Sequence, residues 1–204
     1  MNYNALLQAP HLLIAGTPGS GKSVLLRHLL NARPVDAELV LIDPKRVDFY
    51  DLRKAATIYA DTPAATVRAF RRVAALMESR YKYMRRHGLD KLTTAPVWVV
   101  VDELADLMLS DRKKEIRAEL QHLLQLGRAA NIHVLTATQC PNRRVIPAEL
   151  VLCYTERVAL RCLSPIESRQ IIGTAGAETL PKYGEGLLLD ADGVHRITIP
   201  PPTW

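Results

Sequence analysis

The sequence predicts an α/β protein of three layers, with a mainly parallel sheet between helices and an antiparallel edge at its C-terminal end. Three observations support this fold class. Apolar runs of strand length alternate with amphipathic helical segments along the chain. These runs are continuously apolar, which is typical of parallel strands buried on both faces. The last two apolar runs flank a short polar turn, which indicates a hairpin.

The expected elements follow from these patterns in chain order. HLLIAG is apolar and ends at a glycine, so it predicts a strand, and leucines three and four residues apart predict the helix after it. Pro34 marks the end of the helix at 21–32, and Pro44 marks the end of the strand at 38–44. The sequence predicts strands at 11–16, 38–44, 56–61, 97–103, 132–139 and 156–161, helices at 21–32, 62–87, 113–130 and 165–172, and a hairpin of 186–190 with 195–199.

The segment 62–87 is the longest predicted helix. Thr62 or Asp61 can cap it, Pro63 suits its first turn, and Gly88 can end it. Its other face is rich in arginine and lysine, which leaves two interpretations open: a solvated basic face, or a surface for nucleic acid or another subunit. The apolar residues that predict its buried face are Val67, Phe70, Ala74, Met77, Tyr81 and Met84.

Composition limits the class of protein. The 204 residues suffice for one α/β domain with a sizeable core. No apolar run approaches the roughly 20 residues that cross a bilayer, and the N-terminus lacks a signal-peptide pattern, so we expect a cytoplasmic protein. A net charge of +6 permits contact with nucleic acid but does not require it. Cys140, Cys153 and Cys162 form no Cys-x-x-C pair, so we expect reduced, mostly buried thiols and no structural metal.

The stretch GTPGSGKS, residues 16–23, matches the phosphate-binding loop G-x-x-x-x-G-K-[ST] at every position. A predicted strand precedes it and a predicted helix follows, which argues against a chance match. Glycines let backbone amides approach an anion, and the helix N-terminus adds positive potential. We therefore expect ATP, with Lys22 neutralising phosphate charge and Ser23 holding Mg²⁺. The predicted nucleotide-binding residues are Gly16, Thr17, Pro18, Gly19, Ser20, Gly21, Lys22, Ser23 and Val24.

The stretch VVVDE supplies the second half of this chemistry. Asp102, at the end of a buried strand, is expected to bind Mg²⁺, and Glu103 to act as the general base that polarises the attacking water. The alternative is that both acids are solvated caps at a strand end. Gln139 ends the next strand and is expected to sense the γ-phosphate, unless local backbone groups satisfy it. With Asp43, these side chains would share the carboxyl edge of the sheet, where open α/β sheets bind ligands.

Six segments, in the order in which they follow one another along the chain, resemble the motor domain of the FtsK/SpoIIIE family. The members of this family are hexameric DNA pumps of the RecA-like class. The phosphate loop alone would not be specific, whereas the whole order of motifs is. The resemblance covers most of the chain and implies a ring that hydrolyses ATP and moves double-stranded DNA through its pore. The segments are PHLLIAGTPGSGKS (10–23), LIDPKRVDF (41–49), SRYKYMRRHG (79–88), VVVDELADLM (100–109), GRAANIHVLTATQ (127–139) and ESRQIIGTAGAETL (167–180).

The resemblance also implies roles for single residues. It makes Arg128, in GRAANIH, the arginine finger that reaches a neighbouring subunit's site and neutralises transition-state charge. From the residues alone, Arg128 is a cation at a helix end, near favourable carbonyl groups. Asp43-Pro44-Lys45 matches a family motif whose role the residues do not reveal. The residues that the resemblance supports for catalysis or metal binding are Lys22, Ser23, Asp102, Glu103, Arg128 and Gln139.

Three positions depart from the family's pattern of basic pore residues. The family continues ATQ with Arg-Pro, where this chain has Cys140-Pro141. In an ungapped alignment, two further basic pore positions of the family fall at Val151 and Pro165, and only Arg169, in ESRQ, is retained. Losing phosphate contacts is expected to weaken DNA binding and flatten its salt dependence. Arg143 and Arg144 follow the predicted strand 132–139, which ends at Gln139, and a pore loop that contacts DNA could lie there. The alternative interpretation is that both arginines lie in a solvated loop. The candidate DNA-binding residues are Arg143, Arg144, Arg161 and Arg169.

Taken together, the sequence predicts one motor domain over residues 1–204, without the membrane helices, α/β subdomain or winged-helix module of the family's pumps. It would be a minimal family member or the core of a larger motor, with membrane-anchored or DNA-reading partner proteins. The leading hypothesis is a hexameric ATPase that moves chromosomal, plasmid or mobile-element DNA. One alternative is a motor that moves protein, as related secretion ATPases do. Another is a nucleotide-binding module in a partner ring, which an intact Lys22 and Glu103 argue against.

Overall fold

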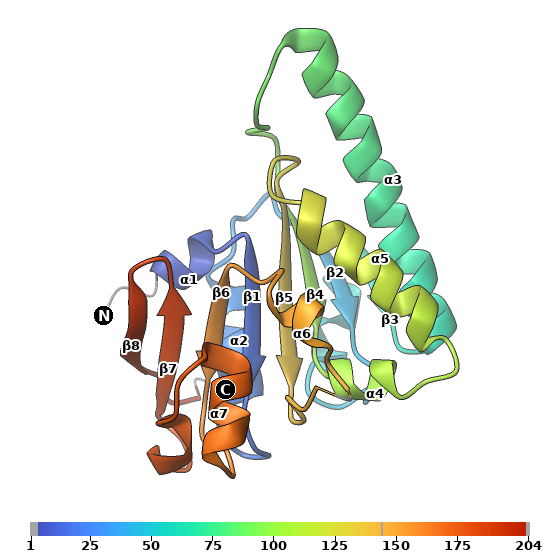
Figure 1. Cartoon of the computed structure of the whole chain (residues 1–204). Helices are drawn as coiled ribbons and strands as arrows, with labels where there is room; N and C mark the ends of the chain where they lie inside the picture. Colours follow the sequence, from blue (N-terminus) through green and yellow to red (C-terminus); the bar gives the residue numbers. More distant parts are fainter. Residues whose placement is uncertain (1–3, 144, 203–204) are drawn as a thin grey trace. The chain divides into compact units, whose positions relative to one another are not determined.

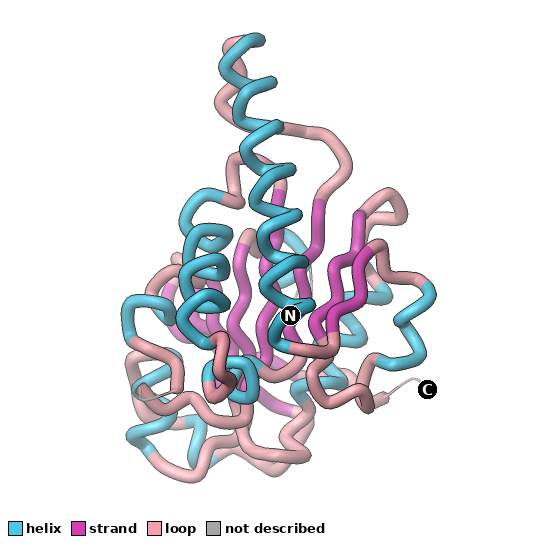
Figure 2. Tube along the Cα trace, turned by 90° about the vertical axis from the view of Figure 1, so that its right-hand side faces the viewer, coloured by secondary structure: helices cyan, strands magenta, loops and turns pink. Residues whose placement is uncertain are grey.

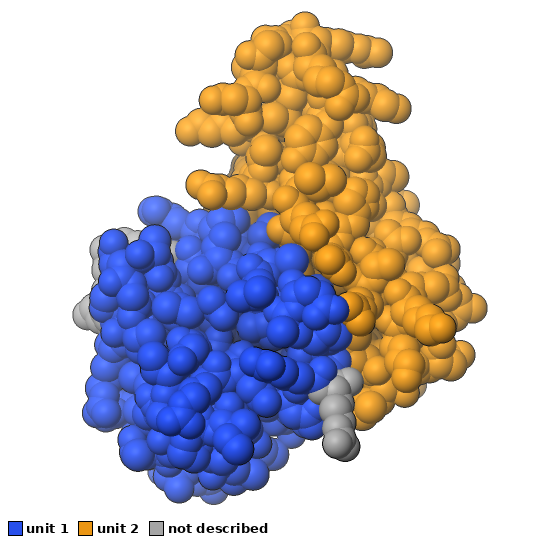
Figure 3. All heavy atoms as spheres, in the orientation of Figure 1, with its two compact units in different colours: residues 1–33, 135–204 blue, residues 34–134 orange. Residues whose placement is uncertain are grey.

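The computed structural model describes residues 4–143 and 145–202, and its packing divides the chain into two compact units (Figure 3). Unit 1 comprises residues 1–33 and 135–204, and unit 2 comprises residues 34–134. The eight strands of the described residues form one sheet in the order β3-β2-β4-β5-β1-β6-β7-β8 (Figure 1). Strand β5, Ile132–Thr138, begins in unit 2 and ends in unit 1.

Unit 2 is built on three parallel strands: β2 (Glu38–Ile42), β3 (Ile58–Ala60) and β4 (Val97–Val101). The register aligns Val40 with Ile58 on one side and with Val99 on the other. All five residues of β4, VWVVV, are buried, as continuous apolar strands of parallel sheets usually are. The helical segments of the unit are η1 (Tyr50–Lys54), α3 (Pro63–His87), α4 (Leu104–Met108) and α5 (Lys113–Leu126).

Helix α3 follows its sequence signals closely. The Thr62 side chain accepts a hydrogen bond from Ala65 N at 3.2 Å, and Gly88 ends the helix in the left-handed conformation. Helices α3 and α5 lie side by side (Figures 1 and 2). Of the predicted apolar face, Tyr81 is only half-buried, and its hydroxyl donates to Leu126 O at 2.6 Å. The buried members are Val67, Phe70, Ala74, Met77 and Met84.

The basic face of α3 is partly committed to contacts within unit 2. Arg71 forms ion pairs with Glu115 at 3.0 Å and Glu119 at 2.9 Å on α5. The Arg80 guanidinium donates to Ala95 O and Ala130 O, both at 2.8 Å, and so ties the helix to two loops. The solvated members of this face are Arg68, Arg72, Lys82, Arg85 and Arg86.

Unit 1 holds the rest of the sheet. Strand β1 (His11–Ala15) pairs in parallel with β6 (Glu156–Ala159), whereas β7 (Glu185–Asp190) and β8 (Gly193–Thr198) form an antiparallel hairpin at its edge. The C-terminal edge is therefore antiparallel, as the sequence predicted. The helical segments of the unit are α1 (Asn4–Gln8), α2 (Lys22–Asn31), α6 (Ala148–Val151), α7 (Pro165–Ile172) and η2 (Ala177–Thr179).

The α/β class and the mainly parallel sheet are confirmed, and most predicted strands and helices end one to four residues earlier than expected. The short helices α1, α4 and α6 were not predicted. The three cysteines are free thiols; Cys162 is buried, while Cys140 and Cys153 are half-buried. No helix among residues 4–143 and 145–202 is both long enough and apolar enough to cross a bilayer.

Candidate nucleotide-binding and catalytic site

The phosphate loop of unit 1 connects β1 to α2. Gly19 and Gly21 have φ angles of 74° and 101°, in the left-handed region that glycine adopts without steric cost. Gly21 is the N-cap of α2 and has no side chain with which to cap the first amides of the helix. Uncapped amides at a helix N-terminus are donors for an anion.

The loop is braced against the segment that follows β6. Thr17 donates to Arg161 O twice, from its backbone nitrogen at 2.8 Å and from Oγ1 at 3.1 Å. A Cβ on Gly16 would stand 2.8 Å from both Leu160 Cβ and Ser20 Oγ, so the loop begins where only glycine fits. The fold therefore sets the position of the loop through contacts far away in the sequence.

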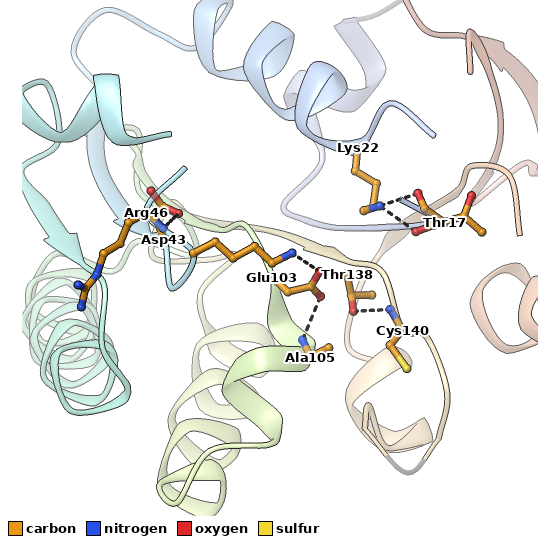
Figure 4. Close-up of polar contacts among 10 residues, drawn as sticks. Thr17, Lys22, Asp43, Arg46, Glu103, Ala105, Thr138 and Cys140 are labelled. Carbon is orange, nitrogen blue, oxygen red and sulfur yellow. Dashed lines mark hydrogen bonds and ion pairs between the residues drawn. The ribbon is translucent and has the colours of Figure 1, made fainter. Parts of the chain in front are cut away.

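Lys22 is buried under the loop that it belongs to. Its ammonium donates to Gly16 O at 2.8 Å and to Thr17 O at 2.9 Å (Figure 4). A phosphate oxygen is a stronger acceptor for an ammonium than a neutral carbonyl, so a bound phosphate can compete for this group. The buried Ser20 Oγ has no hydrogen-bond partner among the described residues, which adds a free polar atom to the interior of the loop.

A second cation approaches the loop from the segment before β7. The Cε atom of Lys182 would lie 3.5 Å from a Cβ placed on Gly19. The Lys182 side chain is exposed, and its Cε atom lies close to Gly19. No motif in the sequence links Lys182 to the phosphate loop, so its position could not be predicted.

The two acids of VVVDE follow β4 in unit 2, and both are buried. Burial, with the neighbouring carboxylates of Asp48 and Asp43, raises the pKa of Asp102 to about 7. Its Oδ2 atom is buried and has no hydrogen-bond partner among the residues that the structure describes. An uncompensated buried carboxylate is costly, so the site has an unmet demand for positive charge.

This demand fits a magnesium ion, which prefers carboxylate and hydroxyl oxygens and keeps several water or phosphate ligands. Asp102 in unit 2 and Ser23 in the phosphate loop stay the predicted ligands of this ion. In the described part of the chain, no three His, Cys, Asp or Glu side chains are grouped as a metal site. A site of the expected kind does not need such a group, because most of its ligands come from water and phosphate.

Glu103 is held from both sides. Its Oε1 atom accepts Ala105 N at 3.2 Å and caps α4, while its Oε2 atom accepts the Lys45 ammonium at 3.1 Å (Figure 4). Burial opposes the charge on Lys45, but Glu103 and nearby acids outweigh burial and raise the pKa of Lys45. The carboxylate that the sequence assigned to catalysis is therefore also a helix cap and one half of an ion pair.

The motif Asp43-Pro44-Lys45 forms the turn that presents this lysine. Asp43 is fully buried; its Oδ1 accepts Arg46 N at 2.9 Å, and its Oδ2 accepts the Tyr59 hydroxyl at 2.8 Å. Arg46 has a φ of 57° and pairs with Asp61 at 3.0 Å. Asp43 thus acts here as a structural anchor of the turn, which gives the motif a role that sequence reasoning did not find.

A family model described as FtsK/SpoIIIE matches residues 2–95 and 91–143 of the chain. The chain belongs to the FtsK/SpoIIIE family. The DNA translocase FtsK of Helicobacter pylori is 35% identical over 218 residues, which cover 96% of this chain and 25% of that protein. The FtsK of Staphylococcus aureus strain Mu50 is 35% identical over 209 residues, which cover 89% of this chain and 26% of that protein. The chain thus spans about a quarter of the length of these relatives.

Solved structures share the fold. The pCW3 conjugation coupling protein TcpA, in a monomer form with ATPγS, has a TM-score of 0.86 at 24% identity, covering 95% of this chain and 60% of that chain. The cytoplasmic domain of the type VII secretion ATPase EccC of Thermomonospora curvata has a TM-score of 0.78 at 24% identity, covering 94% and 25%. The fold and the phosphate loop of this FtsK/SpoIIIE member are those of a P-loop ATPase.

Two further predicted site residues lie at exposed positions. Arg128 is in the turn after α5, where it forms no ion pair with another described residue. An exposed guanidinium can reach outward, as the FtsK/SpoIIIE resemblance implies for an arginine finger. Gln139 directly follows β5 and is exposed rather than buried. Both assignments stay predictions.

The candidate DNA-binding arginines come from different elements of unit 1. Arg143 is exposed in the turn after β5, Arg169 is exposed on α7, and Arg144 lies outside the described residues. Arg161 donates to Leu180 O at 2.8 Å, so its guanidinium is partly committed within the unit. Of the positions where other FtsK/SpoIIIE members carry basic pore residues, Val151 is buried in α6 and Pro165 begins α7. The third position, Cys140, is half-buried after β5.

Proposed function

We propose that this chain is the motor domain of an ATP-driven translocase of double-stranded DNA that works as a ring. The observation that carries the proposal is the FtsK/SpoIIIE match over residues 2–143, which includes both the phosphate loop and VVVDE. The relatives named above are DNA translocases, and TcpA, with the same fold, was solved with an ATP analogue. These findings support ATP as the nucleotide and DNA as the substrate.

In this proposal, the phosphate loop binds ATP through its amides and through Lys22, and Ser23 and Asp102 hold Mg²⁺. The ion would neutralise charge on the β- and γ-phosphates. Glu103 accepts the proton of the attacking water. Gln139 senses the γ-phosphate.

Arg128 completes the proposed reaction from a neighbouring subunit. Its exposure on the surface of unit 2 and its freedom from ion pairs among the described residues support this role. The ring is proposed to be a hexamer. We expect Arg128→Ala to abolish turnover while nucleotide binding persists, and we expect a ring by sedimentation when ATP and DNA are both present. Unchanged turnover in this variant would remove the finger role, and a monomer under those conditions would count against the ring.

DNA contacts are assigned to Arg143, Arg144, Arg161 and Arg169. This chain lacks basic residues at three pore positions of the family. We therefore expect its affinity for DNA to be lower, and to fall less steeply with salt, than in relatives that keep these residues. Membrane-anchored or DNA-reading proteins are the proposed partners. The proposed site of action is the cytoplasm, where ATP and DNA are both present.

The deciding experiment is the steady-state ATPase rate with and without long double-stranded DNA, across a range of salt concentrations. Lys22→Ala controls for contaminating ATPase activity, and Glu103→Gln tests the assigned base. We expect DNA to stimulate turnover, salt to weaken the stimulation, and both variants to lose turnover. A Glu103→Gln protein as fast as the parent would refute the catalytic assignment.

A motor that moves protein is the second candidate, and two observations favour it. The fold is shared with a type VII secretion ATPase, and Cys140, Val151 and Pro165 replace the basic residues that would contact DNA phosphates. ATPase activity that is indifferent to DNA, but intact in the parent and lost in Lys22→Ala, would favour this candidate.

A further inference from the structure

The contact between Lys45 and Glu103 has a consequence for how hydrolysis is controlled. The Lys45 ammonium lies 3.1 Å from Glu103 Oε2, and the side chains are 31% and 3% exposed. Both oxygens of the carboxylate are engaged, because Oε1 accepts Ala105 N. A general base must direct an oxygen toward the water that it deprotonates. In the observed arrangement, neither oxygen of Glu103 is free of a donor.

The two restraints on Glu103 differ in how easily they can be released. The bond to Ala105 N is buried and caps α4, so losing it would leave the first turn of that helix uncapped. The bond to Lys45 involves a flexible side chain that is about a third exposed. Among the described residues, the Lys45 ammonium has no hydrogen-bond acceptor other than Glu103. The lysine is therefore the partner that can leave.

The position of Lys45 is set by the fold. Asp43 anchors the turn through Arg46 N and through the Tyr59 hydroxyl, and Arg46 takes the left-handed conformation and pairs with Asp61. These contacts fix the backbone on both sides of Lys45. The ammonium can leave the carboxylate, but its Cα is held in place and the pair can re-form.

We propose that Lys45 is a positioning residue that restrains the Glu103 carboxylate in a resting orientation, and that hydrolysis requires Lys45 to release it. This inference rests on the proposed function, since it takes Glu103 as the base. The restraint would keep turnover low until nucleotide and polymer are both engaged.

The test compares Lys45→Met and Lys45→Gln, which remove the charge, with Lys45→Arg, which keeps it. Steady-state ATPase is measured with and without long double-stranded DNA, and kcat and KM for ATP are determined separately. Removing one partly exposed ion pair is expected to raise the unstimulated kcat about three- to tenfold, with KM within about twofold of the parent. The stimulation factor falls accordingly, and Lys45→Arg stays close to the parent. Lys54→Met, at an exposed lysine of the same unit, controls for charge removal alone.

The variant Glu103→Gln separates the two proposals. The rise caused by Lys45→Met must vanish when Glu103→Gln is added, because the effect runs through that carboxylate. If Glu103→Gln is inactive and Lys45→Met is unchanged or slower than the parent, the restraint is refuted while the proposed function stands. If Glu103→Gln is as active as the parent, the catalytic assignment of Glu103 and the restraint both fail, while DNA-stimulated ATPase activity of the parent still tests the proposed function. A variant that does not fold is recognised by loss of the buried Trp98 fluorescence signal, read in a background carrying Trp204→Phe, and the second charge-removing variant then decides.

Discussion

The hydrogen bond between Tyr59 and Asp43 offers a quantitative test of how unit 2 is held together. The Tyr59 hydroxyl donates to Asp43 Oδ2 at 2.8 Å, and the acceptor is fully buried. Burial and this carboxylate raise the pKa of Tyr59. Hydrogen bonds to charged groups contribute about 1.5–3 kcal/mol. Because Tyr59 itself is half-buried, water can reach the vacated oxygen, and we expect Tyr59→Phe to cost about 1.5–2 kcal/mol, in the lower part of that range.

The matched control is Tyr81→Phe, which deletes the same hydroxyl elsewhere in unit 2. That hydroxyl donates to the neutral Leu126 carbonyl, and such a bond contributes about 0.5–1.5 kcal/mol. Both variants are compared by urea unfolding, with fluorescence of the buried Trp98 as the probe, in a background carrying Trp204→Phe so that one tryptophan reports. A loss in Tyr59→Phe no larger than in Tyr81→Phe would refute the argument that a buried carboxylate anchors the turn.

Two further predictions concern unit 1. Burial and nearby Glu167 raise the pKa of the Cys162 thiol to about 12, so at pH 8 native protein should react with a thiol reagent at no more than two cysteines per chain, and at the third only after unfolding. Three equally fast thiols in the native protein would contradict this. Gly16→Ala places a Cβ 2.8 Å from Leu160 Cβ and should destabilise the protein by about 1–3 kcal/mol, with a smaller thermal shift on adding ATP; a parent-like melting curve would show that the loop yields.

The long helices and the strands could be predicted because their signals are local. In α3, Thr62, Pro63 and Gly88 act within one turn of the residues that they affect, and the apolar stripe needs no knowledge of its partner. The short helices carry no such signal. Helix α4 has five residues, too few for a helix to be stable alone. Its cap is Glu103, for which the sequence favoured catalysis and left a solvated cap at the strand end as the alternative; the structure makes it a buried helix cap.

In the candidate site, too, local features could be predicted from the sequence and long-range contacts could not. The phosphate loop was predictable because its glycines and lysine act within eight consecutive residues. Its supports are distant: Thr17 and Arg161 are 144 residues apart. The ion pair of Lys45 and Glu103 joins residues 58 apart. No periodicity or spacing rule predicts such a pair, because it depends on β2 and β4 being neighbours in register.

The motif Asp43-Pro44-Lys45 combines a residue that stabilises the turn with a residue that is proposed to control turnover. Asp43 points into the core, where it stabilises the turn through Arg46 N and Tyr59, and a substitution there is expected to act on stability first. Lys45 is partly solvated, and its ammonium donates a hydrogen bond to the carboxylate of Glu103. A substitution there is expected to act on turnover with little change in stability. Because the turn fixes the lysine backbone, damage to Asp43 should also misplace Lys45. A change in turnover caused at Lys45 can therefore be assigned to the carboxylate only when unfolding by urea is unaffected.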